Sequence, residues 1–136
     1  MSVATRLLGV LSVAVVLTSP ACGNDATTTP TATTSPTTVT WATLLGARGA
    51  ASRSFVASQY GTVSVTLQAA AVPLGIGIGV PASSQSVCRP SSSVTASPGD
   101  SPQLTAAVQP GNYCVLVFDV GGISDQIWFT IQLVYP

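Results

Sequence analysis

The chain contains no lysine, no glutamate and no histidine among its 136 residues. Its charged residues are four arginines and four aspartates, so the formal net charge is zero. Most side chains that serve as general bases, or that activate a hydroxyl or thiol nucleophile, are therefore missing, and only aspartate remains. The sequence predicts a protein that is not an enzyme and that uses no cofactor.

Positive charge is also too scarce for nucleic-acid binding. Affinity for nucleic acids depends largely on several Lys or Arg side chains that neutralise phosphates from one side of the protein. The few charged residues are instead spread along the chain: Arg6, Arg48, Arg53, Arg89, Asp25, Asp100, Asp119 and Asp125. We expect no nucleic-acid partner.

The first 21 residues have the layout of an export signal. Arg6 and the terminal amine give a positively charged start, and residues 7–17 form an apolar run of 11 residues. This length fits the hydrophobic segment of a signal peptide, whereas a membrane-spanning helix needs about 20 residues. Ser19 and Ala21 are small residues at the two positions that an ordinary cleavage site requires. Residues 1–21 are therefore predicted to be a signal peptide.

Cys22 suggests a second way of processing that signal. The Ser-Pro-Ala-Cys sequence at residues 19–22 resembles the bacterial lipobox, although Ser19 stands where leucine is usual. An odd number of cysteines in an exported protein needs an explanation, and a lipid on Cys22 would leave Cys88 and Cys114 as one pair. We expect a lipoprotein whose lipid anchors it to the membrane at the bacterial cell envelope. Simple secretion of a soluble protein is the alternative.

Residues 27–38 read TTTPTATTSPTT, in which eight of twelve residues are threonine and two are proline. This stretch has no charge and no large apolar residue, so it cannot bury enough surface to fold. We therefore expect residues 22–38 to be a disordered linker and residues 39–136 to be the folded domain.

The domain alternates apolar with polar residues, as in the run from Val63 to Leu67. This period of two is typical of strands with one buried face. Strands are expected at residues 39–45, 52–57, 62–68, 74–80, 103–108, 113–120 and 127–135, with a weaker one within 84–95. The Pro-Gly-Asn sequence at residues 110–112 is the strongest hairpin signal. About eight short strands predict an all-β fold, a single antiparallel β-sandwich.

Cys114 lies in one expected strand, and Cys88 lies in the weak strand or its loop. We expect these two cysteines to form a disulfide, which would stabilise the domain by roughly 3 kcal/mol.

The order of these segments resembles a known family. Residues 61–67 read GTVSVTL, residues 74–78 read LGIGI, residues 109–117 read QPGNYCVLV, and a last strand runs from Trp128 to Tyr135. Together they look like the bacterial pre-peptidase C-terminal domain, a jelly-roll-like sandwich found on secreted and surface proteins. The resemblance spans about Trp41 to Pro136, and it implies a non-catalytic accessory module. Some relatives bind calcium and some bind polymers.

Two features argue against a metal site. The family strand that is typically rich in aspartate has Gly75, Gly77 and Gly79 here. The three aspartates of the domain lie in or beside turns, where their own hydrogen bonding explains them. We expect no metal. The glycines leave either a shallow trough open to a ligand or, as we expect, a site of close packing against a neighbouring segment.

Three residues are candidates for a contact surface. Trp128 falls on the polar face of its strand, where it is either an exposed stacking platform or covered by a loop. Leu116 and Phe118 lie on the second apolar face of residues 113–120, which is either covered or an exposed patch. Trp41 is expected to face outward as well.

These residues suggest two functions. The first is a non-catalytic lipoprotein at the cell surface or in the periplasm, carrying an accessory module that binds an envelope glycan or protein. The alternative is a structural envelope protein that associates with itself through sheet edges and has no ligand.

Overall fold

The computed structural model describes residues 34–82 and 87–136. The predicted signal peptide, Cys22 and most of the predicted linker lie outside these residues. None of the described residues forms a helix long and apolar enough to cross a membrane.

Eight strands make up the described chain. They are β1 (Thr37–Leu45), β2 (Ala50–Ala57), β3 (Gly61–Ala69), β4 (Leu74–Pro81), β5 (Cys88–Ala96), β6 (Leu104–Val108), β7 (Gly111–Phe118) and β8 (Ile127–Tyr135). Each expected strand is present, including the weak one, which is β5. β1 starts inside the predicted linker, because Thr37 and Thr38 pair with Tyr135 and Val134 of β8.

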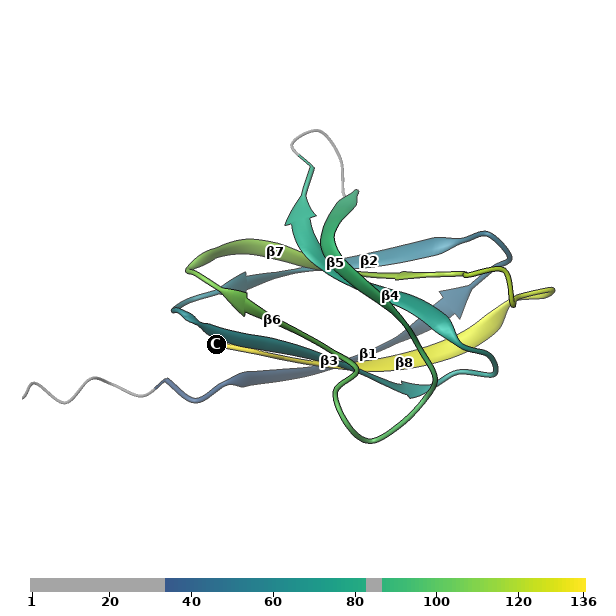
Figure 1. Cartoon of the computed structure of the whole chain (residues 1–136), viewed down its shortest axis with the longest axis horizontal. Helices are drawn as coiled ribbons and strands as arrows, with labels where there is room; N and C mark the ends of the chain where they lie inside the picture. Colours follow the sequence, from purple (N-terminus) through teal and green to yellow (C-terminus); the bar gives the residue numbers. More distant parts are fainter. Residues whose placement is uncertain (1–33, 83–86) are drawn as a thin grey trace, which may run out of the picture. The chain divides into compact units, whose positions relative to one another are not determined.

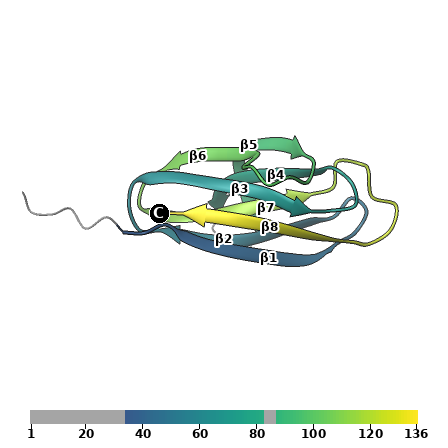
Figure 2. The same cartoon turned by 90° about the horizontal axis from the view of Figure 1, so that it is seen from below.

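The strands form two antiparallel sheets of four, shown as two layers in Figure 1 and Figure 2. Sheet A has the order β1-β8-β3-β6, and sheet B has the order β2-β7-β4-β5. The chain passes from one sheet to the other at every connection except β4–β5. This winding is that of a jelly roll. The predicted all-β sandwich is confirmed.

The strongest hairpin signal was nevertheless misleading. β6 belongs to sheet A and β7 to sheet B, so the Pro-Gly-Asn turn between them joins the two sheets and makes no hairpin. The prediction was wrong because turn residues specify that the chain reverses, but they do not specify which strand it pairs with afterwards. The hairpin of this fold is β4–β5, whose register is antiparallel from Leu74 to Pro81.

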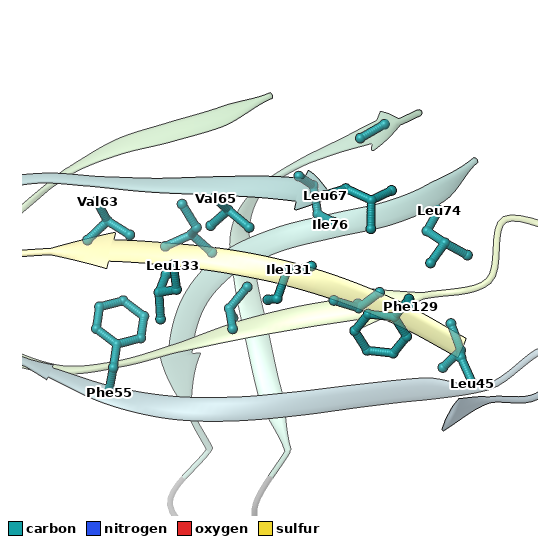
Figure 3. Packing of buried hydrophobic residues seen from close by; sticks show 14 of the residues in the cluster. Leu45, Phe55, Val63, Val65, Leu67, Leu74, Ile76, Phe129, Ile131 and Leu133 are labelled. Carbon is teal, nitrogen blue, oxygen red and sulfur yellow. The ribbon is translucent and has the colours of Figure 1, made fainter. Parts of the chain in front are cut away.

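The core lies between the sheets and follows the alternation seen in the sequence. Apolar residues at every second position point inward, and Figure 3 shows them meeting across the gap between the layers. Fully buried members of this core come from four strands, β3, β4, β7 and β8: Val63, Val65, Leu67, Leu74, Ile76, Ile78, Val115, Val117, Phe129, Ile131 and Leu133. Burial of such side chains contributes about 1.5–3 kcal/mol each, which makes this contact the main source of stability.

The outer face of β4 has no side chains where Gly75, Gly77 and Gly79 alternate with inward-facing residues. These glycines line no open trough, because neighbouring groups lie directly on them. A Cβ atom added to Gly75 would clash with the ring of Phe118, and one added to Gly77 would lie 2.8 Å from Cβ of Pro90. Of the two interpretations of the glycines, close packing is confirmed.

The backbone of β5 crosses β4 at Gly79. A Cβ atom there would clash with the carbonyl oxygen of Arg89 and would lie 2.6 Å from Cα of Pro90. The pairing of β4 with β5 shifts register between Ile78 and Gly79, which leaves Ser91 as an extra residue. The Ser91 hydroxyl donates to the carbonyl oxygen of Ile78 at 3.2 Å. Such a bulge bends a strand, and here it turns β5 across the sheet.

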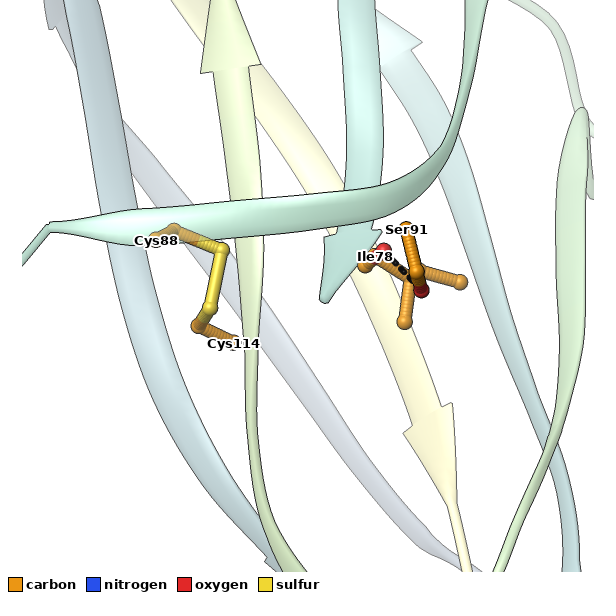
Figure 4. The surroundings of a disulfide bond; sticks show 4 residues. All are labelled: Ile78, Cys88, Ser91 and Cys114. Atoms are coloured by element: carbon orange, nitrogen blue, oxygen red, sulfur yellow. Dashed lines mark hydrogen bonds between the residues drawn. A yellow bond between two sulfur atoms is a disulfide. The ribbon is translucent and has the colours of Figure 1, made fainter. Parts of the chain in front are cut away.

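The Cys88–Cys114 disulfide holds the start of β5 where it lies across the sheet. The predicted disulfide is confirmed. Figure 4 shows the start of β5 lying across β7, with Cys88 above Cys114 and the two Cα atoms 5.7 Å apart. β4 lies between β5 and β7 in the sheet, so the bridge spans a strand rather than joining neighbours. Both cysteines are buried.

We predict that Gly79→Ala lowers the free energy of unfolding by about 3 kcal/mol or more, because the added methyl group would have to displace backbone atoms. Gly46→Ala is the matched control, since its Cβ would lie 3.8 Å from Gln126 and should change stability by no more than about 0.5–1 kcal/mol. Urea unfolding of the oxidised proteins measures both effects. Equal midpoints for the two variants would contradict the described crossing.

Candidate binding surface

Trp128 lies on the outer face of sheet A. Of its neighbours in β8, Phe129 belongs to the core and Ile127 packs against it, so the alternation of the strand turns the indole outward. Trp128 is 65 % exposed, which excludes cover by a loop. The interpretation of Trp128 as an exposed aromatic residue is therefore the one that the structure supports.

Leu44 lies beside Trp128 and enlarges the exposed apolar area of sheet A. It is the cross-strand partner of Trp128 in the pairing of β1 with β8, and it is 40 % exposed. The sequence did not single it out, because Leu44 and Leu45 are adjacent and equally apolar. Only the register shows that Leu45 enters the core while Leu44 faces outward.

The surroundings of Trp128 are polar but uncharged. None of the four strands of sheet A, all of which the structure describes, contains a charged residue. The residues that share the outer face along β1 and β8 carry hydroxyls, amides or methyl groups: Thr38, Thr40, Ala42, Thr130, Gln132 and Val134. A tryptophan on such a neutral face can stack against an apolar ring surface while its neighbours exchange hydrogen bonds with hydroxyl groups.

Leu116 and Phe118 do not contribute to this surface. They face outward from β7 in sheet B, so they lie on the opposite side of the sandwich from Trp128. Both are half-buried, Phe118 against Gly75 and Leu116 opposite Gly77 in the pairing with β4. The structure thus divides the three predicted contact residues between two faces, and Trp128 is the one that is mainly exposed.

Trp41 does not face outward as expected. Its ring meets Phe129 edge to face, with centroids 5.3 Å apart and planes at 85°, and it packs against the core from β1. The expectation was wrong because β1 is an edge strand whose inner positions are polar at Thr37 and Thr43. The alternation of β1 therefore did not reveal which of its faces is the inner one.

Asp119 holds together the turns at one end of the sandwich. Its Oδ2 accepts a hydrogen bond from the backbone N–H of Arg48 at 2.8 Å, and its Oδ1 accepts from those of Gly121, Gly122 and Ile123. These donors, that of Arg48 foremost, hold the pKa of Asp119 below its ordinary value. Asp119 therefore has the structural role expected of a turn residue.

Within residues 34–82 and 87–136, no group of three or more Cys, Asp, Glu or His side chains is placed to hold a metal ion. No enclosed cavity is found in the same part of the chain. The surface features that remain are exposed side chains on the sheets, and Trp128 with Leu44 is the cross-strand pair among them.

We predict that Asp119→Asn destabilises the domain at neutral pH, because an amide has one acceptor oxygen and cannot accept hydrogen bonds from all four N–H groups. Because the pKa of Asp119 is lowered in the folded state, its carboxylate stabilises the protein at pH values above the ordinary aspartate pKa of about 3.9. This contribution is lost as the pH falls through the folded-state pKa. The difference in melting temperature between wild type and variant should therefore shrink as pH falls below about 4. Asp100→Asn is the control. A difference that is independent of pH would contradict the prediction.

A scan of the sequence against family models finds no match, and a search of curated proteins finds no similar protein. The likeness of its strand motifs to the pre-peptidase C-terminal domain therefore stays a resemblance. Trp128, Leu44 and the neutral face around them are the basis on which we infer a function.

Proposed function

We propose that this protein is an exported, lipid-anchored, non-catalytic module that binds a neutral polymer, with an envelope glycan as the preferred class, through the face of sheet A that carries Trp128. The observation that carries the proposal is the exposed Trp128–Leu44 pair on a face without charge. No cavity is found among the described residues, so the open sheet face suits an extended ligand that lies along it.

Chemistry favours a glycan over a charged polymer. Sugar rings combine apolar C–H faces with hydroxyl rims, which match an indole beside Thr130 and Gln132. An anionic polymer would gain from positive side chains, but Arg53 and Arg89 are in sheet B and Arg48 is in the β1–β2 loop. Neutrality of the face thus supports an uncharged glycan or an uncharged stretch of protein.

The location is proposed from residues outside those that the structure describes. Arg6 and the apolar run at residues 7–17 support export, and Cys22 supports a lipid anchor. A disulfide such as Cys88–Cys114 persists mainly in oxidising compartments, so it is compatible with this location. The resemblance to the pre-peptidase C-terminal domain supports an accessory role for the module.

We predict that Trp128→Ala weakens binding to insoluble cell-wall glycan or to a soluble neutral glucan by about tenfold or more, since burial of a large apolar side chain contributes about 1.5–3 kcal/mol. In a Trp41→Phe background Trp128 is the remaining tryptophan, so its fluorescence reports binding directly. Leu116→Ala, on the opposite face, is the control. Equal binding by Trp128→Ala and Leu116→Ala would refute the platform.

We also predict the mass of the native protein. It should match an acylated chain that begins at Cys22, and it should increase by two hydrogens when Cys88 and Cys114 are reduced. Mass spectrometry of detergent-extracted protein gives both values, with Cys22→Ser as the control that cannot be acylated. A chain without lipid would refute the anchor and would direct the search for a ligand to the extracellular medium.

A further inference from the structure

A sandwich of two four-stranded sheets has four edge strands, and their unpaired backbone groups can bind another strand. Here the edges are β1 and β6 of sheet A, and β2 and β5 of sheet B. Three of them carry features that are known to prevent strand addition, whereas β1 does not.

The two edges of sheet B are blocked by different means. β2 carries Arg53 at a position whose neighbours on the same face, Ala51 and Phe55, pack in or against the core. Arg53 is exposed, and an inward-facing charge on an edge strand disfavours the addition of another strand beside it. β5 contains Pro90, which has no N–H group, and the bulge at Ser91 bends it across β4.

The β6 edge of sheet A is short. It has five residues, Leu104–Val108, and prolines lie close to both ends at Pro102 and Pro110. A strand of this length offers few backbone groups, and proline cannot extend the ladder.

The β1 edge has none of these features. It is nine residues long, and each residue from Thr37 to Leu45 pairs with β8 in one unbroken register. Its sequence, TTVTWATLL, contains no charge, no proline and no glycine. In an antiparallel ladder about half of the backbone groups of an edge strand point away from its partner. Among the described residues no strand pairs with this second side of β1.

We propose that β1 pairs antiparallel with β1 of a second copy of this chain, so that two copies of sheet A join into one continuous sheet. A two-fold axis through the middle of the strand lets all nine residues pair at once, because opposite positions of the two strands then lie on the same face. Pairing centred on Trp41 would place the half-buried Trp41 side chain of one copy beside the Trp41 side chain of the other.

The composition of β1 favours a second copy over a different partner. The two strands of a self-pairing carry the same net charge, so any charge on β1 would repel the charge on its copy. β1 is uncharged, as is the whole of sheet A, so this repulsion is absent. Only one such edge exists in each described chain, so the association closes at a dimer and does not continue into a fibre.

The joined surface is small, since it consists of two strands and the side chains that flank them. Interfaces below about 1,200 Å² are typical of weak, transient complexes. The dimer should therefore form at concentrations of roughly 10–100 µM or above in solution.

The test is sedimentation of the purified protein with Cys22→Ser, so that neither lipid nor a free thiol contributes to association. This Cys22→Ser protein, with no further change, should rise from the mass of a monomer towards that of a dimer between about 5 and 500 µM. Thr40→Lys combined with Ala42→Lys places charges at the centre of β1 on its exposed face and should weaken association at least tenfold. Thr105→Lys with Ala107→Lys makes the same two changes on the outer face of β6 and should leave the dimer unchanged.

Circular dichroism of both double variants serves as the control that they are folded. A Cys22→Ser protein that stays monomeric throughout the range would overturn the proposal, as would equal weakening by the β1 and β6 variants. Growth beyond a dimer would also overturn it, because a two-fold pairing closes. None of these outcomes depends on a glycan, so the proposed binding function and this association can fail separately.

Discussion

Burial of one face of every strand between two sheets is the interaction on which this structure depends. The chain has too few charged side chains to hold itself together by ion pairs, and the disulfide links strands of a single sheet. The apolar residues that meet between the layers, with Phe129 and Ile131 among the most buried, therefore carry the fold. Because alternate positions face inward, the same pattern decides what is left outside: hydroxyls, amides, glycines and a few exposed apolar side chains.

The two outer faces of the sandwich differ in how far the chain itself covers them. On sheet B, Phe118 lies on Gly75, β5 crosses at Gly79, and Cys88 is bonded to Cys114, so this face is covered by the chain itself. On sheet A the residues around Trp128 stay open, and no strand carries a charge. The open face is the one suited to a ligand because nothing from the same chain competes for it, whereas the glycines of β4 are used for packing.

The edges of the sheets show a similar division. A charge at Arg53, a proline at Pro90 and the short length of β6 each reduce the value of an edge as a template for another strand. β1 has the opposite character, since it is long, regular and neutral. Ligand binding at Trp128 and pairing at β1 involve neighbouring parts of sheet A, so a dimer would present two tryptophans on one continuous face.

The class of fold, the approximate place of all eight strands and the Cys88–Cys114 pair could be predicted from the sequence, because alternation and cysteine parity are local or countable properties. The sequence also indicated that Trp128 faces outward, since the apolar residues beside it define the inner face of β8. The pairing of the strands, the joining of two sheets by the turn at residues 110–112 and the inward direction of Trp41 became known from the three-dimensional structure. The sequence also could not show that Trp128 lies on the opposite side of the sandwich from Leu116 and Phe118. Alternation within a strand determines which face a residue is on, but contacts between residues distant in sequence determine which sheet the strand joins.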